Sequence, residues 1–209
     1  MFLQMTYSKK ENIFFILLLF ILNLALRFPS LKYVFLDVDE SQFAGFAHVL
    51  MGGGLPYRDS LDTKPLLIYY FFAAIFSLFG RTNMMAVHFV SILISFFVAL
   101  ILWDAGRRST NETTGRWAAL LWVVFSTCYF PKFIGTSITS VMILPLCLAV
   151  WMIIKDEITK GEREVRPYIW AGLFIGIAFL FKYQGGIQLV IIGLFLLTQF
   201  LKKEIKLKY

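Results

Sequence analysis

The stretch from Asp37 to Pro65, DVDESQFAGFAHVLMGGGLPYRDSLDTKP, decides how the rest of this chain is organised. It is the longest polar interval in the sequence and holds five of the thirteen carboxylates. Apolar runs flank it, and hydrophobic residues make up 59% of the chain against 16% charged residues. Soluble domains have about 45–50% and about 25% of these classes. The sequence therefore predicts a membrane protein whose first large loop is this stretch.

The apolar runs predict the spans of this membrane protein. They lie at 13–28, 66–79, 84–103, 117–130, 138–154, 168–181 and 187–201. With Pro65 the second run gives about 22 Å of helix at 1.5 Å per residue, short of a hydrocarbon core of about 30 Å. Keeping it outside the bilayer puts thirteen of the twenty Lys and Arg residues on the side of the N-terminus, as the positive-inside rule favours.

The predicted fold class is an all-α, polytopic transmembrane helical bundle of about six spans in one domain, 1–209. Residues 30–83 form an extracytoplasmic loop with juxtamembrane amphipathic helices, and both termini are cytoplasmic. Gly172 and Gly176 form a small-xxx-small pair, which predicts close packing of the fifth span on a neighbour. The formal charge of +7 is explained by basic cytoplasmic loops, so no nucleic-acid partner is predicted.

The first half of the loop predicts a short amphipathic helix. Asp39 is a good N-cap, Gln42 stands at the third helical position, and Val38 with Phe43 fits a hydrophobic staple. The apolar positions recur at helical spacing and give one face: Phe43, Phe46, Ala47 and Leu50. Three glycines, 52–54, end the pattern. We expect this helix to lie on the outer membrane surface with its carboxylates at the water boundary.

The charged residues of the loop also suggest chemistry. Helix capping alone accounts for Asp39, at about 1 kcal/mol, and this structural interpretation stays open. It does not explain why three carboxylates gather there, or why Lys64 follows in the same loop. A reaction on a lipid phosphate needs this combination, because a carboxylate deprotonates the attacking hydroxyl and a cation stabilises the phosphate leaving group.

Three segments carry a resemblance to a known family. The acidic pair Asp39-Glu40 is followed by 54–59, GLPYRD, and by 62–70, DTKPLLIYY, and a later segment, 172–182, reads GLFIGIAFLFK. These segments resemble the polyprenyl-phosphate-sugar-dependent glycosyltransferases of the GT-C fold, in particular the bacterial branch related to protein mannosyltransferases and aminoarabinose lipid A transferases. The resemblance implies transfer of a sugar from a polyprenyl phosphate to an acceptor hydroxyl, with inversion at the anomeric carbon.

By motif position, the resemblance assigns roles to individual residues. Asp39 would be the general base, Glu40 its supporting carboxylate, and Lys64 would face the donor phosphate. Tyr57 and Arg58, in the motif between them, are further candidates for substrate binding, with a solvated surface charge as the other interpretation of Arg58. Lys182, at the outer end of the fifth predicted span, either snorkels to the interface or helps to hold the donor phosphate.

The resemblance also implies partners and a location. The partners are a polyprenyl-phosphate-linked sugar, an acceptor that is a lipid, a glycan or a protein, and membrane lipids, in the cytoplasmic membrane of a bacterium or an archaeon. Family members often carry an acidic residue before the fourth span, whereas 135–140 reads GTSITS here. No cofactor is therefore predicted, and a divalent metal is kept as an alternative. The two histidines, His48 and His88, have no metal-ligand spacing and are predicted to be structural.

Two departures from the family keep other functions open. The motif reads Lys-Pro-Leu at 64–66 where the family usually has Lys-Pro-Pro. Full members are about twice as long, so we expect this chain to be the N-terminal half of a GT-C-like module. A non-catalytic membrane scaffold, or a subunit of a split transferase, is the alternative function. A transporter is disfavoured, because it would place ionisable groups near the membrane midplane.

Overall fold

The computed structural model describes residues 8–60, 62–127, 134–158, 163–201 and 207–208. Its helices are α1 (Lys9–Arg27), η1 (Phe28–Lys32), α2 (Val38–Met51), α3 (Leu67–Phe79), α4 (Met84–Ser109), α5 (Glu112–Phe125), α7 (Ile138–Ile158), α8 (Arg166–Phe181) and α9 (Gly185–Leu201). Two short strands, β1 (Arg163–Glu164) and β2 (Leu207–Lys208), pair in parallel. The described chain is otherwise helical, which confirms the predicted fold class.

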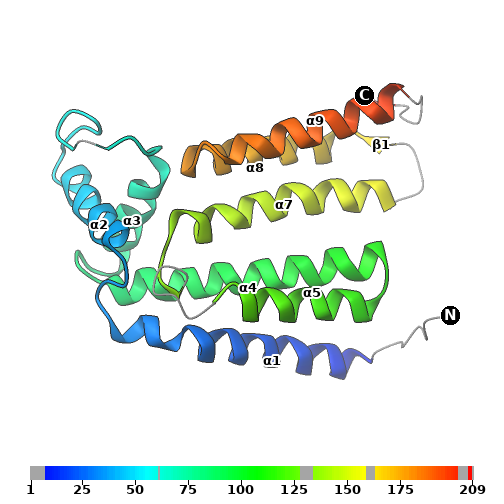
Figure 1. Cartoon of the computed structure of the whole chain (residues 1–209), viewed down its shortest axis with the longest axis horizontal. Coiled ribbons are helices and arrows are strands. Elements are labelled where there is room, and N and C mark those ends of the chain that lie inside the picture. Colours follow the sequence, from blue (N-terminus) through cyan, green and yellow to red (C-terminus); the bar gives the residue numbers. More distant parts are fainter. Residues whose placement is uncertain (1–7, 61, 128–133, 159–162, 202–206, 209) are drawn as a thin grey trace.

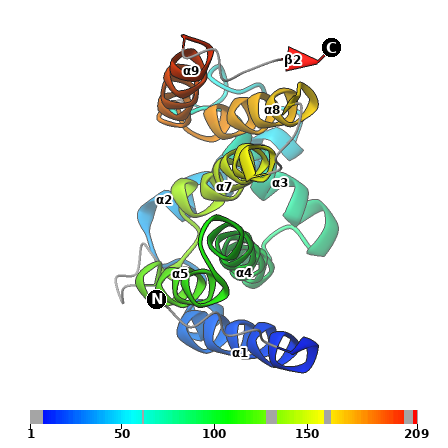
Figure 2. The same ribbon diagram turned by 90° about the vertical axis from the view of Figure 1, so that its right-hand side faces the viewer.

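The longer helices form a bundle, and two shorter ones close one end of it (Figure 1). α1, α4, α5, α7, α8 and α9 run along a common direction, whereas α2 and α3 lie together at one end. α1 begins and α9 ends at the opposite end. Figure 2 looks along the bundle and shows the helices stacked from α1 through α5 and α4 to α7, and then to α8 and α9.

Length divides the apolar helices of the chain into two groups. In the described part of the chain, three segments are long and apolar enough to cross a membrane: Lys9–Lys32, Met84–Ser109 and Ile138–Glu157. Shorter apolar helices cover Leu67–Phe79, Arg166–Phe181 and Gly185–Thr198. α5 has 14 residues, and the last part of its predicted span, 128–130, lies outside the described residues. The orientation of the bundle in the membrane stays a prediction.

α3 is the short helix that the sequence leaves outside the bilayer. It has 13 residues and ends at Gly80, whose φ of 110° belongs to the left-handed region that favours glycine. α3 packs on the apolar face of α2, with the rings of Phe43 and Phe72 5.7 Å apart and those of Phe46 and Tyr69 5.2 Å apart. The apolar face of α2 therefore lies on another helix, and not directly on lipid as we expected.

Polar side chains and glycines join the long helices. Asn23 of α1 donates its amide to the carbonyl oxygen of Ile92 in α4 at 2.9 Å, and it accepts a hydrogen bond from Ser95 Oγ at 3.0 Å. Such contacts hold helices together in a bilayer, where the hydrophobic effect does not. Gly106 of α4 faces Gly115 of α5 so closely that a Cβ atom on Gly106 would lie 2.7 Å from the Gly115 Cα.

The predicted close packing through Gly172 and Gly176 is wrong. A Cβ atom added at either glycine would meet no described atom within 4 Å outside the helix itself. The buried face of α8 consists of other residues: Ala171, Ile175, Ala178 and Phe181. Each glycine follows a buried residue by one position, and one position turns the helix by about 100°. The small-residue spacing is thus present in the sequence but points away from the packed face.

Candidate active site

The loop carboxylates lie in the first turn of α2. The helix begins at Val38, with Asp37 at the N-cap, so the predicted N-cap at Asp39 is wrong by two residues. The chain turns earlier because the Glu40 side chain accepts a hydrogen bond from the Leu36 backbone N–H at 2.7 Å, which fixes the residues before the helix. Val38 is 80% exposed while Phe43 is fully buried, so the predicted staple does not form.

After α2 the chain turns back toward its own start. Gly52 is the C-cap of the helix and Gly53 has φ 84°, so the glycines end α2 as predicted. Tyr57, with φ 63°, directs its hydroxyl group to the backbone carbonyl of Lys64 and donates a hydrogen bond of 2.8 Å. Tyr57 therefore positions the backbone from which the Lys64 side chain extends.

Lys64 returns to the first turn of α2 and meets Asp39 there. Its Nζ lies 3.1 Å from Asp39 Oδ1 and 3.1 Å from Gln42 Oε1, with Asp62 Oδ2 at 3.9 Å. The same ammonium group stands 4.7 Å from the centre of the Phe43 ring, a cation–π contact. The Asp39 and Lys64 side chains are 33% and 27% exposed, so both partners remain accessible.

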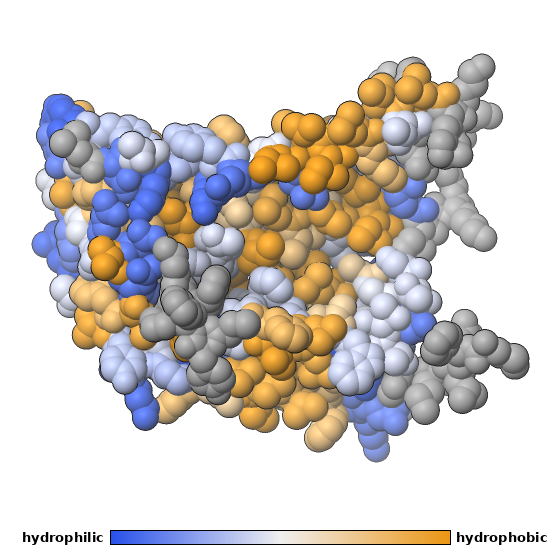
Figure 3. Space-filling view, in the orientation of Figure 1, coloured by the Kyte–Doolittle hydropathy of each residue, from blue (hydrophilic) through white to orange (hydrophobic). Residues whose placement is uncertain are grey.

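Asp39 and Lys64 open onto a cleft of about 330 Å³ at the polar end of the bundle. Figure 3 shows hydrophilic side chains gathered at this end, around α2 and α3. The turn from α8 to α9 closes the cleft with Lys182, and the start of α7 faces it. The described lining residues are Asp39, Thr63, Lys64, Pro65, Ser137, Ile138, Thr139, Lys182, Tyr183 and Gln184.

The α7 end of the cleft favours an anion. Ser137 caps this helix, because its Oγ accepts a hydrogen bond from the Ser140 backbone N–H at 3.1 Å. A helix N-terminus carries a partial positive charge and points N–H groups outward. Lys64 and Lys182 lie on other walls, so two basic side chains and one carboxylate, Asp39, line the described part of the cleft.

Glu40 faces away from this cleft and is buried. Its Oε1 lies 3.0 Å from His88 Nε2 of α4 and also accepts a hydrogen bond from the Thr136 backbone N–H. The other ring nitrogen, His88 Nδ1, lies 2.7 Å from the carbonyl oxygen of Ser30. The side chains of Glu40 and His88 are 2% and 0% exposed. This buried cluster connects α2, α4, η1 and the segment before α7.

The hydrogen bonds of this cluster fix the proton on one ring nitrogen. A carbonyl oxygen only accepts, so His88 Nδ1 must carry a proton toward Ser30. Glu40 accepts hydrogen bonds from two backbone N–H groups and also meets His88 Nε2. One proton lies between Glu40 Oε1 and His88 Nε2 and joins the two side chains, whichever of them carries it.

Gly135 makes room for the Glu40 carboxylate. A Cβ atom on Gly135 would overlap Glu40 Oε1 and would lie 3.1 Å from Glu40 Cδ. Only a glycine lets the backbone of 134–136 come close enough for Thr136 N–H to bond this carboxylate.

Two tyrosines near the cleft, Tyr57 and Tyr69, donate hydrogen bonds to other residues of the segment 57–69. The Tyr69 hydroxyl donates a short hydrogen bond to Asp62; burial, and then this bond, raise the pKa of Tyr69 well above its ordinary value. Burial, and then the proximity of Tyr183 and Asp62, raise the pKa of Tyr57. Both phenols therefore stay protonated and act as hydrogen-bond donors at neutral pH.

The structure brings together only part of the predicted set. Asp39, Lys64 and Lys182 line one cleft. Tyr57 does not line it but donates a hydrogen bond to the backbone carbonyl of Lys64. Glu40 lies in the buried cluster. Arg58 is 68% exposed and pairs with Asp59 at 2.8 Å, a contact that lowers the pKa of Asp59. Arg58 is not among the described lining residues. The roles of these residues stay predictions.

Several contacting residues were not predicted to be site residues: Gln42, Asp62, Thr136, Tyr183 and Gln184. Asp62 stands in the same motif as Lys64, and that proximity in sequence was the available signal. His88 was predicted to be structural, and a role in the buried cluster agrees with that interpretation. Among the described residues, no three His, Cys, Asp or Glu side chains come together as a metal site.

Comparison with known proteins places the chain in a family. Residues 63–209 match the family model of dolichyl-phosphate-mannose-protein mannosyltransferase. The matched part contains Lys64 and Lys182, whereas Asp39 and Glu40 precede it. Neither a curated protein nor a solved structure gives a significant match.

Proposed function

The chain belongs to the dolichyl-phosphate-mannose-protein mannosyltransferase family, a family of membrane glycosyltransferases that use lipid-linked sugars, and from that premise we propose a reaction for its cleft. The cleft transfers a sugar from a polyprenyl-phosphate donor to an acceptor hydroxyl, with inversion at the anomeric carbon. The observation that carries the proposal is the Asp39–Lys64 pair, joined at 3.1 Å, at the mouth of a cleft that Lys182 also lines.

Asp39 has the position of a general base. Its carboxylate is one-third exposed and faces the cleft, where an acceptor hydroxyl can reach it. Asp39 takes the hydroxyl proton as the acceptor oxygen forms its bond to the anomeric carbon, and the carbon–oxygen bond to phosphate breaks. The bonding electrons leave with the phosphate, which gains one negative charge as Asp39 loses one by protonation.

The negative charge on the leaving phosphate is stabilised by Lys64, Lys182 and the start of α7. Lys64 pairs with Asp39, and the arrival of a donor phosphate gives its ammonium group a second anion to bind. The α7 N-terminus adds backbone N–H groups to the same region. Positive groups aimed at the leaving phosphate stabilise the transition state more than the ground state, because the charge develops there.

The number of carboxylates supports inversion. Retention through a covalent intermediate needs a carboxylate nucleophile and a second carboxyl group as acid and base. Among the described lining residues of this cleft, Asp39 is the single carboxylate. One carboxylate suffices for a single displacement, in which the acceptor attacks from the face opposite the phosphate.

The cleft end of the bundle is proposed to face away from the cytoplasm, with both termini cytoplasmic in a bacterial or archaeal membrane. Basic residues collect at the far end, where α4 ends, α7 ends and α8 begins: Arg107, Arg108, Lys155 and Arg166. Basic residues favour the cytoplasmic side. A reporter inserted after Ser109 tests the orientation, and an extracytoplasmic signal there contradicts it.

Sugar transfer by membranes that express the chain tests the reaction. With a synthetic polyprenyl-phosphate sugar as donor, we expect Asp39→Asn to lower the rate about 10²–10⁴-fold, the usual contribution of a general base. Asp59→Asn is the matched control, because Asp59 lies in the same loop but pairs with exposed Arg58. An unchanged rate in Asp39→Asn removes Asp39 from the mechanism. No transfer by the wild-type chain favours the alternative, a scaffold or a subunit of a split transferase.

A further inference from the structure

Lys64 lies at unequal distances from two carboxylates. Its Nζ is 3.1 Å from Asp39 Oδ1 and 3.9 Å from Asp62 Oδ2. Asp39 is among the described lining residues of the cleft, and Asp62 is not. Direct pairing with Asp62 would therefore draw the Lys64 ammonium group away from the cleft, so the longer distance to Asp62 needs a physical cause.

Asp62 is held by donors other than Lys64. The Tyr69 hydroxyl of α3 donates a hydrogen bond to Asp62 Oδ2, and the Thr63 backbone N–H donates one to Asp62 Oδ1 at 2.6 Å. The Asp62 side chain is 9% exposed, so these donors take the place of water at its carboxylate. The oxygen that lies 3.9 Å from Lys64 Nζ is thus the one that the Tyr69 hydroxyl holds.

The Tyr69 ring is held in turn by α2. Its centre lies 6.0 Å from that of the Phe43 ring and 5.2 Å from that of the Phe46 ring, and Tyr69 is 2% exposed. Closely packed side chains keep to one rotamer, so the hydroxyl group has one position. A phenylalanine at position 69 fits the same space, and only the hydroxyl oxygen is lost.

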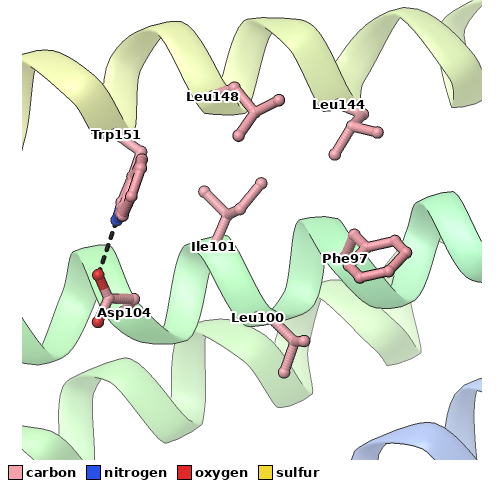
Figure 4. Close-up of a pocket in the computed structure, with 7 residues that line it drawn as sticks. All are labelled: Phe97, Leu100, Ile101, Asp104, Leu144, Leu148 and Trp151. Atoms are coloured by element: carbon pink, nitrogen blue, oxygen red, sulfur yellow. Dashed lines mark hydrogen bonds between the residues drawn. The ribbon is translucent and has the colours of Figure 1, made fainter. Parts of the chain in front are cut away.

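A neutral donor on a carboxylate oxygen does not by itself keep a cation away. Asp104 Oδ2 accepts a hydrogen bond from Trp151 Nε1 at 2.7 Å across an apolar groove between α4 and α7 (Figure 4). The same oxygen accepts another from Arg108 Nε at 2.6 Å. The 3.9 Å between Asp62 and the lysine therefore reflects where Tyr69 places the carboxylate, and not a lack of lone pairs on its oxygen.

We propose that Tyr69 is a positioning residue, which keeps Asp62 from pairing directly with Lys64 and so leaves the ammonium group at the cleft for a donor phosphate. The inference rests on the proposed function, since that phosphate belongs to the donor of the proposed reaction. Loss of the hydroxyl leaves the buried Asp62 carboxylate one donor short, and Lys64 is the cation within reach, at 3.9 Å. The direct pair then stabilises the chain without donor and must break when the phosphate binds.

Thermal unfolding tests the contact without any donor. Asp62→Asn, Lys64→Met and their double variant give the coupling between the two charges, first in the wild type and then in the Tyr69→Phe chain. We expect this coupling to increase by about 2–4 °C in the unfolding midpoint when the hydroxyl is absent, the size of one partly exposed ion pair. Equal coupling with and without the hydroxyl overturns the proposal.

The rate of sugar transfer tests the consequence for the donor. Tyr69→Phe should raise the KM for a synthetic polyprenyl-phosphate sugar about fivefold and leave kcat unchanged, because the new pair stabilises only the chain without donor. Asp62→Asn in the same chain should restore the KM, whereas a merely structural loss would add to the first. Tyr70→Phe is the matched control, since it removes the same oxygen from a neighbouring, half-exposed ring and should keep the wild-type KM.

Two outcomes of the transfer assay contradict the proposal: no rescue by Asp62→Asn, and an equal increase of the KM in Tyr70→Phe. The two measurements also separate this inference from the reaction on which it rests. If the wild-type chain transfers no sugar while the coupling still increases without the Tyr69 hydroxyl, the proposed function fails and the role of Tyr69 in holding Asp62 stands.

Discussion

Two carboxylates that are neighbours in the chain, Asp39 and Glu40, occupy opposite environments. Asp39 faces an accessible cleft and shares Lys64 with Gln42 and Asp62. Glu40, one position further along α2, is enclosed by His88 and by two backbone N–H groups. A step of one helical residue turns a side chain by about 100°, which is enough to separate the cleft from the interior.

The different exposure of the two carboxylates predicts different roles for them. An exposed ion pair contributes little to stability, about 0–1 kcal/mol, and can exchange partners. A buried pair is costly to break, because removal of one partner leaves an uncompensated charge. In the proposed mechanism Asp39 changes its contacts during the reaction, whereas the contacts of Glu40 join α2 to α4. Substitutions can therefore disrupt the contacts of Glu40 and leave those of Asp39 intact, or the reverse.

The largest effect is expected from His88→Leu. If Glu40 and His88 form an ion pair, the substitution leaves the Glu40 carboxylate buried without its cation, and we then expect a loss of about 3–5 kcal/mol in the free energy of unfolding, measured in detergent with a chemical denaturant. The double variant Glu40→Gln with His88→Leu removes both charges and should be less destabilised than His88→Leu alone. If His88→Leu unfolds like the wild type, Glu40 and His88 are not an ion pair.

A smaller effect is expected from Gly135→Ala. The added methyl group overlaps the Glu40 carboxylate, and overpacking of this kind costs about 1–3 kcal/mol. Gly172→Ala is the control, because nothing described lies within 4 Å of its new Cβ and alanine favours a helix by about 0.5–1 kcal/mol. Thermal unfolding of both variants compares them, and destabilisation of Gly172→Ala alone would contradict the packing described here.

The smallest change in stability is expected from Lys64→Met. Its ion pair with Asp39 is partly exposed, so the free energy of unfolding should change by less than about 1 kcal/mol. Donor binding should weaken about tenfold or more, since a hydrogen bond to a charged group contributes about 1.5–3 kcal/mol. Arg58→Met makes the same charge change in the same loop at a 68% exposed side chain. Equal binding of donor by both variants would remove Lys64 from the site.

The sequence predicted that Asp39 and Lys64 belong to one loop, and the structure brings these two side chains to 3.1 Å from each other. Whether they form an active site stays a prediction. The start of α2 was misplaced, because the choice between Asp37 and Asp39 depends on the Glu40 side chain, which bonds Leu36 only in the folded chain. The glycine pair in α8 was assigned to the wrong face for a similar reason, since spacing alone does not say which side of a helix meets a neighbour.

By itself the sequence determined that this protein is a helical membrane protein, which helices are short, and that carboxylates and a lysine share one loop. Those properties follow from hydrophobic run length and local residue order, which need no knowledge of contacts. Only the tertiary structure decided that Asp39 opens to the cleft while Glu40 is buried, and that Lys182 and the start of α7 complete that cleft. Burial depends on which distant segments cover a side chain, and for Glu40 those segments are His88 and 134–136, which follow it by more than forty positions.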